Sequence, residues 1–247
     1  MGEVSIRFLG SGDAFGSGGR FQTCMYVRSE ATHLLVDCGA SSLVAMKHFG
    51  VDPLLIDTIV LSHLHGDHFG GVPFIIMDAR YASQREKPLT VAGPPGLETR
   101  VYEAMEVLYP GSGKTQNRFA LKFVELAEGT ETRDSLVAVT PYGVVHHSGA
   151  PSYALRIALD GKVFAYSGDT EWTDALIPAS RGADLFVCEC NFFEKGGGQH
   201  LDYQTLMDHL PELDCRRLIL THMNDGMLHR VGSLDVEGAE DGKVVVL

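Results

Sequence analysis

The sequence predicts a single α/β (α+β layered) domain that spans residues 1–247, and three observations support this fold class. Strand-like and helix-like segments are mixed along the whole chain, and hairpins stand beside strand–helix units. Several apolar runs also end in a histidine or an aspartate, as strands do when their ends line a cleft. No linker, low-complexity segment or internal repeat divides the chain, so we expect one domain.

The first half of the chain predicts strands and helices in alternation. A helix that Ser41 or Ser42 can cap ends at Gly50, and a second one stops before Pro110. The segment 111–118 is polar and rich in helix breakers, so it is expected to be a loop. Strands are expected at 4–9, 23–28, 33–37, 59–61, 89–92 and 121–125, and helices at 42–49, 74–81 and 97–109.

The second half predicts further hairpins and strand–helix units. Asp160-Gly161 is a strong two-residue turn signal between two strands. Asp202 can cap a helix that runs to about Leu210. Strands are expected at 136–142, 143–146, 153–159, 162–167, 185–189, 217–221 and 244–247, and a further helix at 172–179.

Composition limits the classes of function. The chain is 45% hydrophobic and carries a formal net charge of −12, which argues against a long nucleic-acid footprint. No apolar run has transmembrane length, and the N-terminus does not resemble a signal peptide. The five cysteines are odd in number and lack a framework spacing, so a reduced, cytoplasmic protein is expected.

Two local features have competing interpretations. Cys188 and Cys190 could form a metal pair, but their alternating strand pattern favours buried cysteines. The segment 10–20 is rich in glycine, yet it lacks the Gly-Lys-Ser/Thr of a phosphate-binding P-loop. It is interpreted either as a loop that flanks a site or as ordinary turn chemistry.

The stretch 63–68 has the strongest functional signal in the chain. The apolar run 59–61 leads into His63-Leu64-His65-Gly66-Asp67-His68, which holds four ligand-type side chains. His63 and His65 can point the same way as the strand ends, whereas Asp67 and His68 project differently, so one loop can serve two metal ions. Imidazole nitrogen and carboxylate oxygen suit zinc, with manganese and iron as competitors.

Further ligand-type residues follow three later apolar runs. Strand ends that gather along one edge of a sheet would bring all of these side chains into one cleft. Two metals with open positions could then activate a bridging hydroxide, and an aspartate is the natural bridge. The predicted ligands are His63, His65, Asp67, His68, His146, Asp169 and His222.

These residues resemble the signature of the metallo-β-lactamase superfamily. The stretch 63–68 carries the resemblance, and His146, the segment 167–170 and the segment 220–223 match the later stations in order. The resemblance implies an αββα sandwich with a dinuclear zinc site.

The same resemblance divides the ligands between two zinc ions. One ion would take His63, His65 and His146, and Asp169 would bridge the two. The second ion would take Asp67, His68 and His222.

Within the superfamily the chain is most similar to the ribonuclease Z and small-phosphodiesterase branch. That branch implies His200 as a general acid that Glu189 could orient; a loop histidine is the competing interpretation. The branch pattern also favours His146 over His147 as the ligand. Two departures stand out: a hairpin occupies the interval between His146 and Asp169, where ribonuclease Z has its tRNA-gripping arm, and Glu189 sits in Cys-Glu-Cys-Asn.

The predicted function is a dinuclear zinc phosphodiesterase that cleaves a small or nucleotide-like phosphodiester by a metal-bridged hydroxide, with Asp67, Glu189 and His200 as catalytic residues. The alternatives are a tRNA 3′-processing endonuclease without the arm, a lactonase or thioesterase on the same metals, and a non-catalytic metal-dependent binding protein. We expect a small anionic phosphoester as partner, no long nucleic acid and no membrane; a homodimer is left open. His33, His48, His209 and His229 are interpreted as surface or packing residues.

Overall fold

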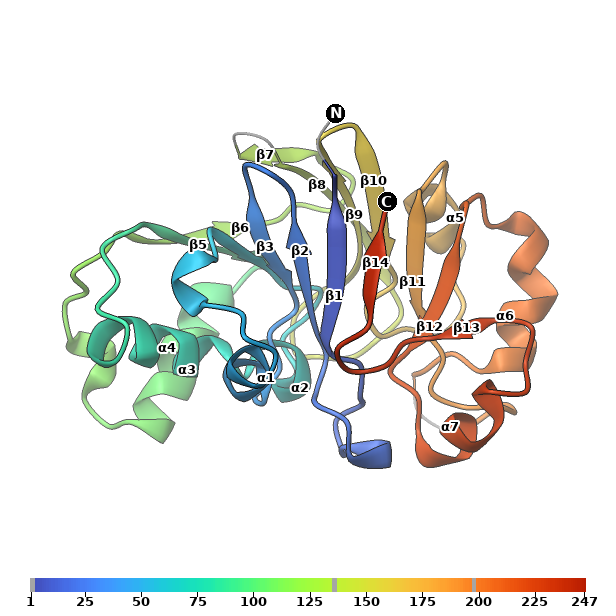
Figure 1. Ribbon diagram of the computed structural model, residues 1–247, viewed down its shortest axis with the longest axis horizontal. Helices are drawn as coiled ribbons and strands as arrows, with labels where there is room; N and C mark the ends of the chain where they lie inside the picture. Colours follow the sequence, from blue (N-terminus) through green and yellow to red (C-terminus); the bar gives the residue numbers. More distant parts are fainter. Residues whose placement is uncertain (1–2, 135–136, 197–198) are drawn as a thin grey trace.

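The computed structural model describes residues 3–134, 137–196 and 199–247. Two mixed sheets lie at the centre, with helices on both outer sides (Figure 1). The first sheet has the strand order β14-β1-β2-β3-β4-β5-β6 and the second β13-β12-β11-β10-β9-β8-β7. The α/β layered fold class predicted from the sequence is confirmed.

The first sheet is formed mainly by the N-terminal half of the chain. Its strands are antiparallel from β14 to β3 and parallel from β3 to β6. The strands are β1 (Ser5–Gly10), β2 (Cys24–Arg28), β3 (His33–Val36), β4 (Thr58–Val60), β5 (Leu89–Gly93), β6 (Leu121–Glu125) and β14 (Val244–Val246).

The second sheet repeats this plan with the C-terminal half. It is antiparallel from β7 to β10 and parallel from β10 to β13. The strands are β7 (Thr132–Asp134), β8 (Val137–Val144), β9 (Ser152–Leu159), β10 (Lys162–Tyr166), β11 (Leu185–Glu189), β12 (Leu218–Thr221) and β13 (Glu237–Gly238).

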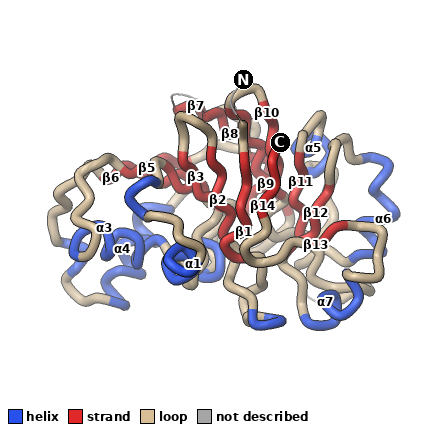
Figure 2. Tube along the Cα trace, viewed as in Figure 1, coloured by secondary structure: helices blue, strands red, loops and turns tan. Residues whose placement is uncertain are grey.

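The helices cover the outer faces and gather near one edge of the sheets, as Figure 2 shows in blue. On the first sheet they are α1 (Ser42–His48), α2 (Gly66–Phe69), α3 (Val72–Tyr81) and α4 (Leu97–Leu108), and on the second α5 (Leu176–Ser180), α6 (Tyr203–His209) and α7 (Asp225–Val231). Short 3-10 turns are η1 (Ser17–Gly19), η2 (Pro53–Leu55), η3 (Ser112–Lys114) and η4 (Leu210–Glu212). None of the helices in the described ranges is long and apolar enough to cross a membrane.

Three apolar clusters hold these layers together. The central cluster joins the inner faces of both sheets, with side chains such as Phe8 and Val36 from one and Ile157 and Phe164 from the other. The two outer clusters fill the space between each sheet and its helices. The layers are therefore helix, sheet, sheet and helix, because each sheet buries both of its faces.

Most predicted elements are present, and several local predictions are confirmed. Asp160 and Gly161 have φ angles of 49° and 77°, as a tight two-residue hairpin turn requires. Asp202 accepts a hydrogen bond from the backbone N–H of Thr205 at 2.8 Å and so caps α6. The predicted loop 111–118 contains only the short turn η3.

Other predictions differ from the structure. The expected break at Gly143 is absent, because β8 pairs continuously with β9 from Val137 to Val144. On its other side, β8 pairs with β7 only through Val137, Ala138 and Val139. Gly143 lies beyond this pairing, so it interrupts no hydrogen-bonded ladder on that side. Leu136, the first residue of the predicted strand, lies outside the described residues. The helix expected from Trp172 begins only at Leu176, and the Trp172 ring stacks on His209 instead.

Candidate metal centre

The ligand loop follows directly from β4, which is buried between β3 and β5. The loop delivers His63 and then turns at His65 into the short helix α2, which carries Asp67 and His68. Both faces of β4 are covered, so the chain leaves the sheet at its carboxyl end in one defined direction. The four ligand-type side chains therefore start from a rigid base.

Three further residues reach the same region from the second sheet. His146 follows β8, Asp169 follows β10 and His222 follows β12. Strands β10 and β12 run parallel with β11 between them, so their carboxyl ends meet at one edge of the sheet. His222 has a φ of 56°, a left-handed conformation that is uncommon outside glycine.

Four of these residues form a fully buried group: Asp67, His68, Asp169 and His222. His68 Nε2 lies 3.3 Å from Asp67 Oδ2 and 3.2 Å from Asp169 Oδ2. His222 Nε2 lies 3.2 Å and 3.4 Å from the same two oxygens. Two imidazoles and two carboxylates thus converge on one point.

His63, His65 and His146 form a second, more accessible group. His65 Nδ1 lies 3.0 Å from His146 Nε2. Asp169 Oδ2 stands between the two groups, at 3.8 Å from His63 Nε2 and 3.9 Å from His146 Nε2. One carboxylate therefore faces both sets of nitrogens.

The donor set fits a pair of metal ions. His63 Nε2, His68 Nε2 and Asp169 Oδ1 are buried polar atoms without a hydrogen-bond partner in the described part of the chain. Such atoms are costly unless something coordinates them. One group offers three imidazole nitrogens, and the other offers two imidazole nitrogens and two carboxylates. Such donors suit zinc, and manganese or iron are chemically acceptable.

A buried hydrogen-bond system holds His68 in place. Asp37 Oδ2 accepts from His68 Nδ1 at 2.6 Å, which directs His68 Nε2 toward the cluster. Asp37 also accepts from the backbone N–H of Ser62 at 2.7 Å and from its hydroxyl at 2.8 Å. A carboxylate behind a histidine ligand fixes the tautomer and raises the basicity of the ligand.

The other imidazoles have different supports. Asn191 donates from Nδ2 to the carbonyl of His222 at 2.9 Å. The carbonyl of Gln199 lies 3.0 Å from His146 Nδ1 and can accept its proton. Asp37, Ser62, Asn191 and Gln199 were not foreseen as parts of the site. The position of Asp37 at the end of a strand was the only local signal that could have pointed to it.

His200 and Glu189 form a pair beside the cluster. His200 Nδ1 lies 3.0 Å and 3.2 Å from the two carboxylate oxygens of Glu189, at the end of β11. Burial lowers the pKa of His200, but its hydrogen bond to Glu189 and the charges of Glu189 and Asp169 outweigh burial and raise the pKa to about 9. An imidazole in this setting is held in its protonated form.

The charged groups of the cluster also shift one another's pKa values. Burial lowers the pKa of His68, but the carboxylates of Asp169, Asp67 and Asp37 raise it well above its ordinary value. Burial raises the pKa of Asp169, yet the surrounding histidines hold it well below its ordinary value. The aspartates of the cluster are therefore anionic, as coordination to a cation requires.

A cavity of about 520 Å³ opens onto the cluster. Its lining combines side chains of the cluster with residues of two neighbouring loops: residues 13–15, His65, Gly66, Asp67, His146, Asp169, Asn191, Phe192, His200 and His222. Asp13 accepts hydrogen bonds from Phe15 and Ser17 and so shapes the glycine-rich loop, which does flank the site.

Other candidate residues lie outside the cluster. His147 is exposed beside His146 and is absent from both groups. Cys188 is a buried cysteine of β11, and Cys190 is buried one residue beyond the end of that strand. Both are free, and neither belongs to a group that could hold a metal among the described residues, so the metal-pair interpretation is not supported.

The remaining histidines have other neighbours. His33 contacts the hydroxyl of Tyr26, and His209 stacks on Trp172. His48 packs against Phe21 and Phe49, and His229 lies on α7.

The composition of the segment 192–200 favours a mobile lid that hinges at the glycines 196–198. Gly197 and Gly198 of this hinge lie outside the described residues. Phe193 stacks on Tyr203 with ring centroids 5.5 Å apart, and the guanidinium of Arg230 lies 4.4 Å from its ring centroid. At this point the loop is packed against α6 and α7, so movement as a lid stays a prediction.

The sequence matches a family model described as Anti-Pycsar protein Apyc1 over residues 4–239. Among curated relatives, ribonuclease Z of Agathobacter rectalis is 24% identical over 277 residues, which cover 91% of this chain and 89% of that protein. The anti-Pycsar protein Apyc1 of Bacillus phage 010DV004 is 26% identical over 236 residues, which cover 91% of this chain and 90% of that protein.

Solved structures show the same fold. The metallo-β-lactamase fold protein YhfI from Bacillus subtilis has a TM-score of 0.80 at 22% identity and covers 99% of this chain and 100% of its own. The short form of human tRNase Z has a TM-score of 0.78 at 22% identity, with 98% of each chain covered. A diphosphatase of the PhnP family has a TM-score of 0.77 at 16% identity and covers 98% and 97%.

Proposed function

The chain belongs to the anti-Pycsar protein Apyc1 family, and from this premise we propose that it is a dinuclear zinc phosphodiesterase for a small or nucleotide-like phosphodiester. It is a metal-dependent hydrolase of the metallo-β-lactamase superfamily, in the branch related to ribonuclease Z, as the resemblance implied. The proposal therefore concerns the number and kind of the metals, the bond that is cleaved and the residues that act.

One observation carries the proposal: two groups of ligand-type side chains share Asp169. Asp169 Oδ2 faces His68 and His222 of the buried group and His63 of the accessible group. A shared carboxylate with separate histidine sets is the arrangement that two neighbouring cations need. Two zinc ions held here would supply Lewis acidity toward a phosphoryl oxygen and a water that ionises near neutral pH.

The residues of this chain would orient the ester and handle the proton. Asp67 and Asp169 hold the charge at the bottom of the cavity, so an anionic phosphodiester can enter only when cations balance them. His200 lines the cavity and has Nδ1 engaged by Glu189. Its Nε2 is then the atom that can give a proton to the leaving oxygen, and Glu189 keeps the imidazole charged and oriented.

The test is turnover of bis-p-nitrophenyl phosphate by protein whose metal content has been measured. The proposal expects activity that rises with zinc up to two ions per chain. A lactone and a thioester are assayed in parallel, because the same metals could cleave them. No phosphodiester turnover in the di-zinc protein, together with good lactone or thioester turnover, would reject the proposal.

Processing of tRNA 3′ ends is the second candidate, because several curated relatives are named ribonuclease Z. The structure supports it less well. The interval between His146 and Asp169 is filled by the β9–β10 hairpin, which leaves no arm, and the formal net charge is −12. A precursor tRNA cleaved at a rate comparable to bis-p-nitrophenyl phosphate would favour this candidate.

A further inference from the structure

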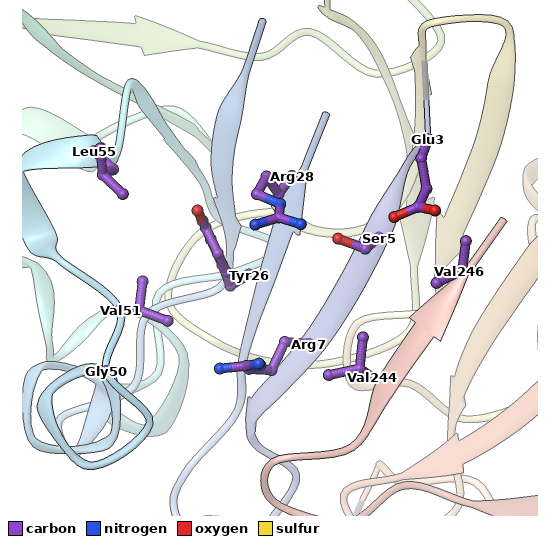
Figure 3. Close-up of a pocket in the computed structure, with 10 residues that line it drawn as sticks. All are labelled: Glu3, Ser5, Arg7, Tyr26, Arg28, Gly50, Val51, Leu55, Val244 and Val246. Carbon is purple, nitrogen blue, oxygen red and sulfur yellow. The ribbon is translucent and has the colours of Figure 1, made fainter. Parts of the chain in front are cut away.

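A second pocket, of about 330 Å³, lies on the outer face of the first sheet, away from the metal centre. Strands β14, β1 and β2 form its floor, and the segment from Gly50 to Leu55 forms one wall (Figure 3). No residue that lines it belongs to the metal-ligand groups or to the cavity beside them. Its volume lies at the lower end of the range of about 300–1,000 Å³ that small-molecule sites occupy.

The strand register brings two arginines to this pocket. Arg7 pairs with Tyr26, and Ser5 pairs with Arg28, so all four side chains share one face of the sheet. Arg7 and Arg28 are therefore diagonal neighbours on adjacent strands, which long side chains can bridge. Figure 3 shows the guanidinium of Arg28 and the hydroxyl of Ser5 turned toward each other, with Arg7 below them and its guanidinium turned toward the segment at Gly50.

Within the described part of the chain, the two guanidinium groups have no carboxylate at ion-pair distance. Among the described residues, the arginines within ion-pair distance of a carboxylate are Arg133, Arg216 and Arg217. Arg7 donates instead to the backbone carbonyl of Phe49 at 3.0 Å, which holds its guanidinium across the pocket floor. Two cations thus face a single lining carboxylate, Glu3, in a chain whose net charge is −12.

The rest of the lining is apolar. Leu55, Val244 and Val246 are 42%, 48% and 55% exposed. Figure 3 shows Leu55 and the buried Val51 on one side of the polar residues and the two valines of β14 on the other. A bare anion would leave Leu55 in water, whereas an organic group beside the phosphate would cover it. A guanidinium fork matches the oxygens of a phosphate, and a phosphomonoester carries more charge than a diester.

We propose that this pocket binds a small organic phosphomonoester, with its phosphate on Arg7, Arg28 and the Ser5 hydroxyl and its organic part on Val51 and Leu55. The site is independent of the proposed hydrolysis. The phosphomonoester would bind in this pocket whether or not the metal centre is active.

The test is isothermal titration calorimetry of the metal-loaded protein with phenyl phosphate and, separately, with inorganic phosphate. Phenyl phosphate can also bind at the metal centre, so the wild type is compared with Arg7→Gln, Arg28→Gln and the double variant. Arg181→Gln removes the same charge from an exposed position elsewhere and serves as the matched control. Turnover of bis-p-nitrophenyl phosphate and the midpoint of thermal unfolding check that each variant is folded.

The proposal expects one binding event to vanish in the double variant and to persist in Arg181→Gln, with turnover unchanged in both. Each single substitution should weaken that event about tenfold or more, because a charged hydrogen bond is lost. Leu55→Ser should weaken phenyl phosphate but leave inorganic phosphate unaffected. Identical isotherms for wild type and double variant would overturn the site, and equal affinities for the two ligands would overturn the assignment to an organic ester.

Discussion

The two ligand groups differ in how the protein supports them. Asp67, His68, Asp169 and His222 are all buried, whereas His65 and His146 are only partly buried at the cavity. Behind the buried group, Asp37 holds His68 with a full negative charge. Behind the accessible group, the partners are uncharged: the carbonyl of Gln199 faces His146 Nδ1, and the Ser62 hydroxyl lies 3.0 Å from His63 Nδ1.

Because of this difference, we expect the two ligand groups to bind their cations with different affinities. The buried group has anionic ligands and a charged outer partner, so we expect it to bind its cation more tightly. The accessible group has three imidazoles and no carboxylate of its own, and it shares the carboxylate of Asp169. We expect it to keep the position that a substrate oxygen can reach.

The largest expected effect comes from Asp169→Asn, because this change removes the carboxylate that both groups share. Turnover of bis-p-nitrophenyl phosphate should fall by more than about 10⁴-fold, beyond what a single general acid contributes. Elemental analysis should show fewer than two metals per chain. Asp160→Asn, in the β9–β10 turn, is the matched control and should change neither; two retained metals with normal turnover in Asp169→Asn would contradict a bridging role.

His200→Gln should lower kcat by about 10²- to 10⁴-fold. Metal content should stay unchanged, because the two ligand groups are complete without His200, although His200 also lies within coordination range of His146 and Asp169. The pKa of His200 is raised to about 9 from an ordinary value of 6.5, so the imidazole loses its proton as the pH rises through about 9. The rate of the wild type should therefore fall on the alkaline side, and this limb should be missing in the variant.

The same shift has a consequence for stability. Because the folded-state pKa of His200 lies above its ordinary value, its contact with Glu189 stabilises the fold fully below about pH 6.5. That contribution is lost as the pH rises through about 9. The free energy of unfolding, measured with urea across this pH range, should decline in the wild type and not in His200→Gln. If the variant keeps the alkaline fall in the rate, that fall belongs to the titration of another group.

Asp37→Asn tests the support of the buried group. The side chain keeps its size but loses its charge, so zinc affinity should fall about 10- to 100-fold, as for other outer partners of histidine ligands. Competition with a chelator of known affinity measures this. Asp57→Asn, one strand away at the surface, is the control; equal zinc affinities in the two variants would mean that the charge of Asp37 does not act on the metal.

The smallest effect is expected at His147. It is exposed and lies outside both groups, so His147→Ala should stay within about twofold of the wild type, as most surface substitutions do. His146→Ala, its neighbour in the chain, should lose a metal ion and more than about 100-fold in activity. A reversed pattern would assign the ligand to His147.

Much of the fold could be predicted because its signals are local. The Asp160-Gly161 turn and the cap at Asp202 depend on a few consecutive residues, and both have the expected geometry. The predictions at 143–146 and 172–179 were less accurate for a tertiary reason. Pairing with β9 keeps β8 extended through Gly143, and the stacking of Trp172 on His209 holds that residue outside the helix.

The sequence alone determined which side chains could hold metal, since the spacing in 63–68 and the strand-end positions of His146, Asp169 and His222 are visible in one dimension. Only the tertiary structure decided which of them meet and what stands behind them. The contact of Asp37 with His68 and that of His200 with Glu189 join residues from different elements. Such contacts depend on which segments lie side by side at the edge of each sheet, and the meeting of Asp67 with His222 depends on how the two sheets stack. Burial and hydrogen-bond geometry are therefore set across the fold rather than along the chain.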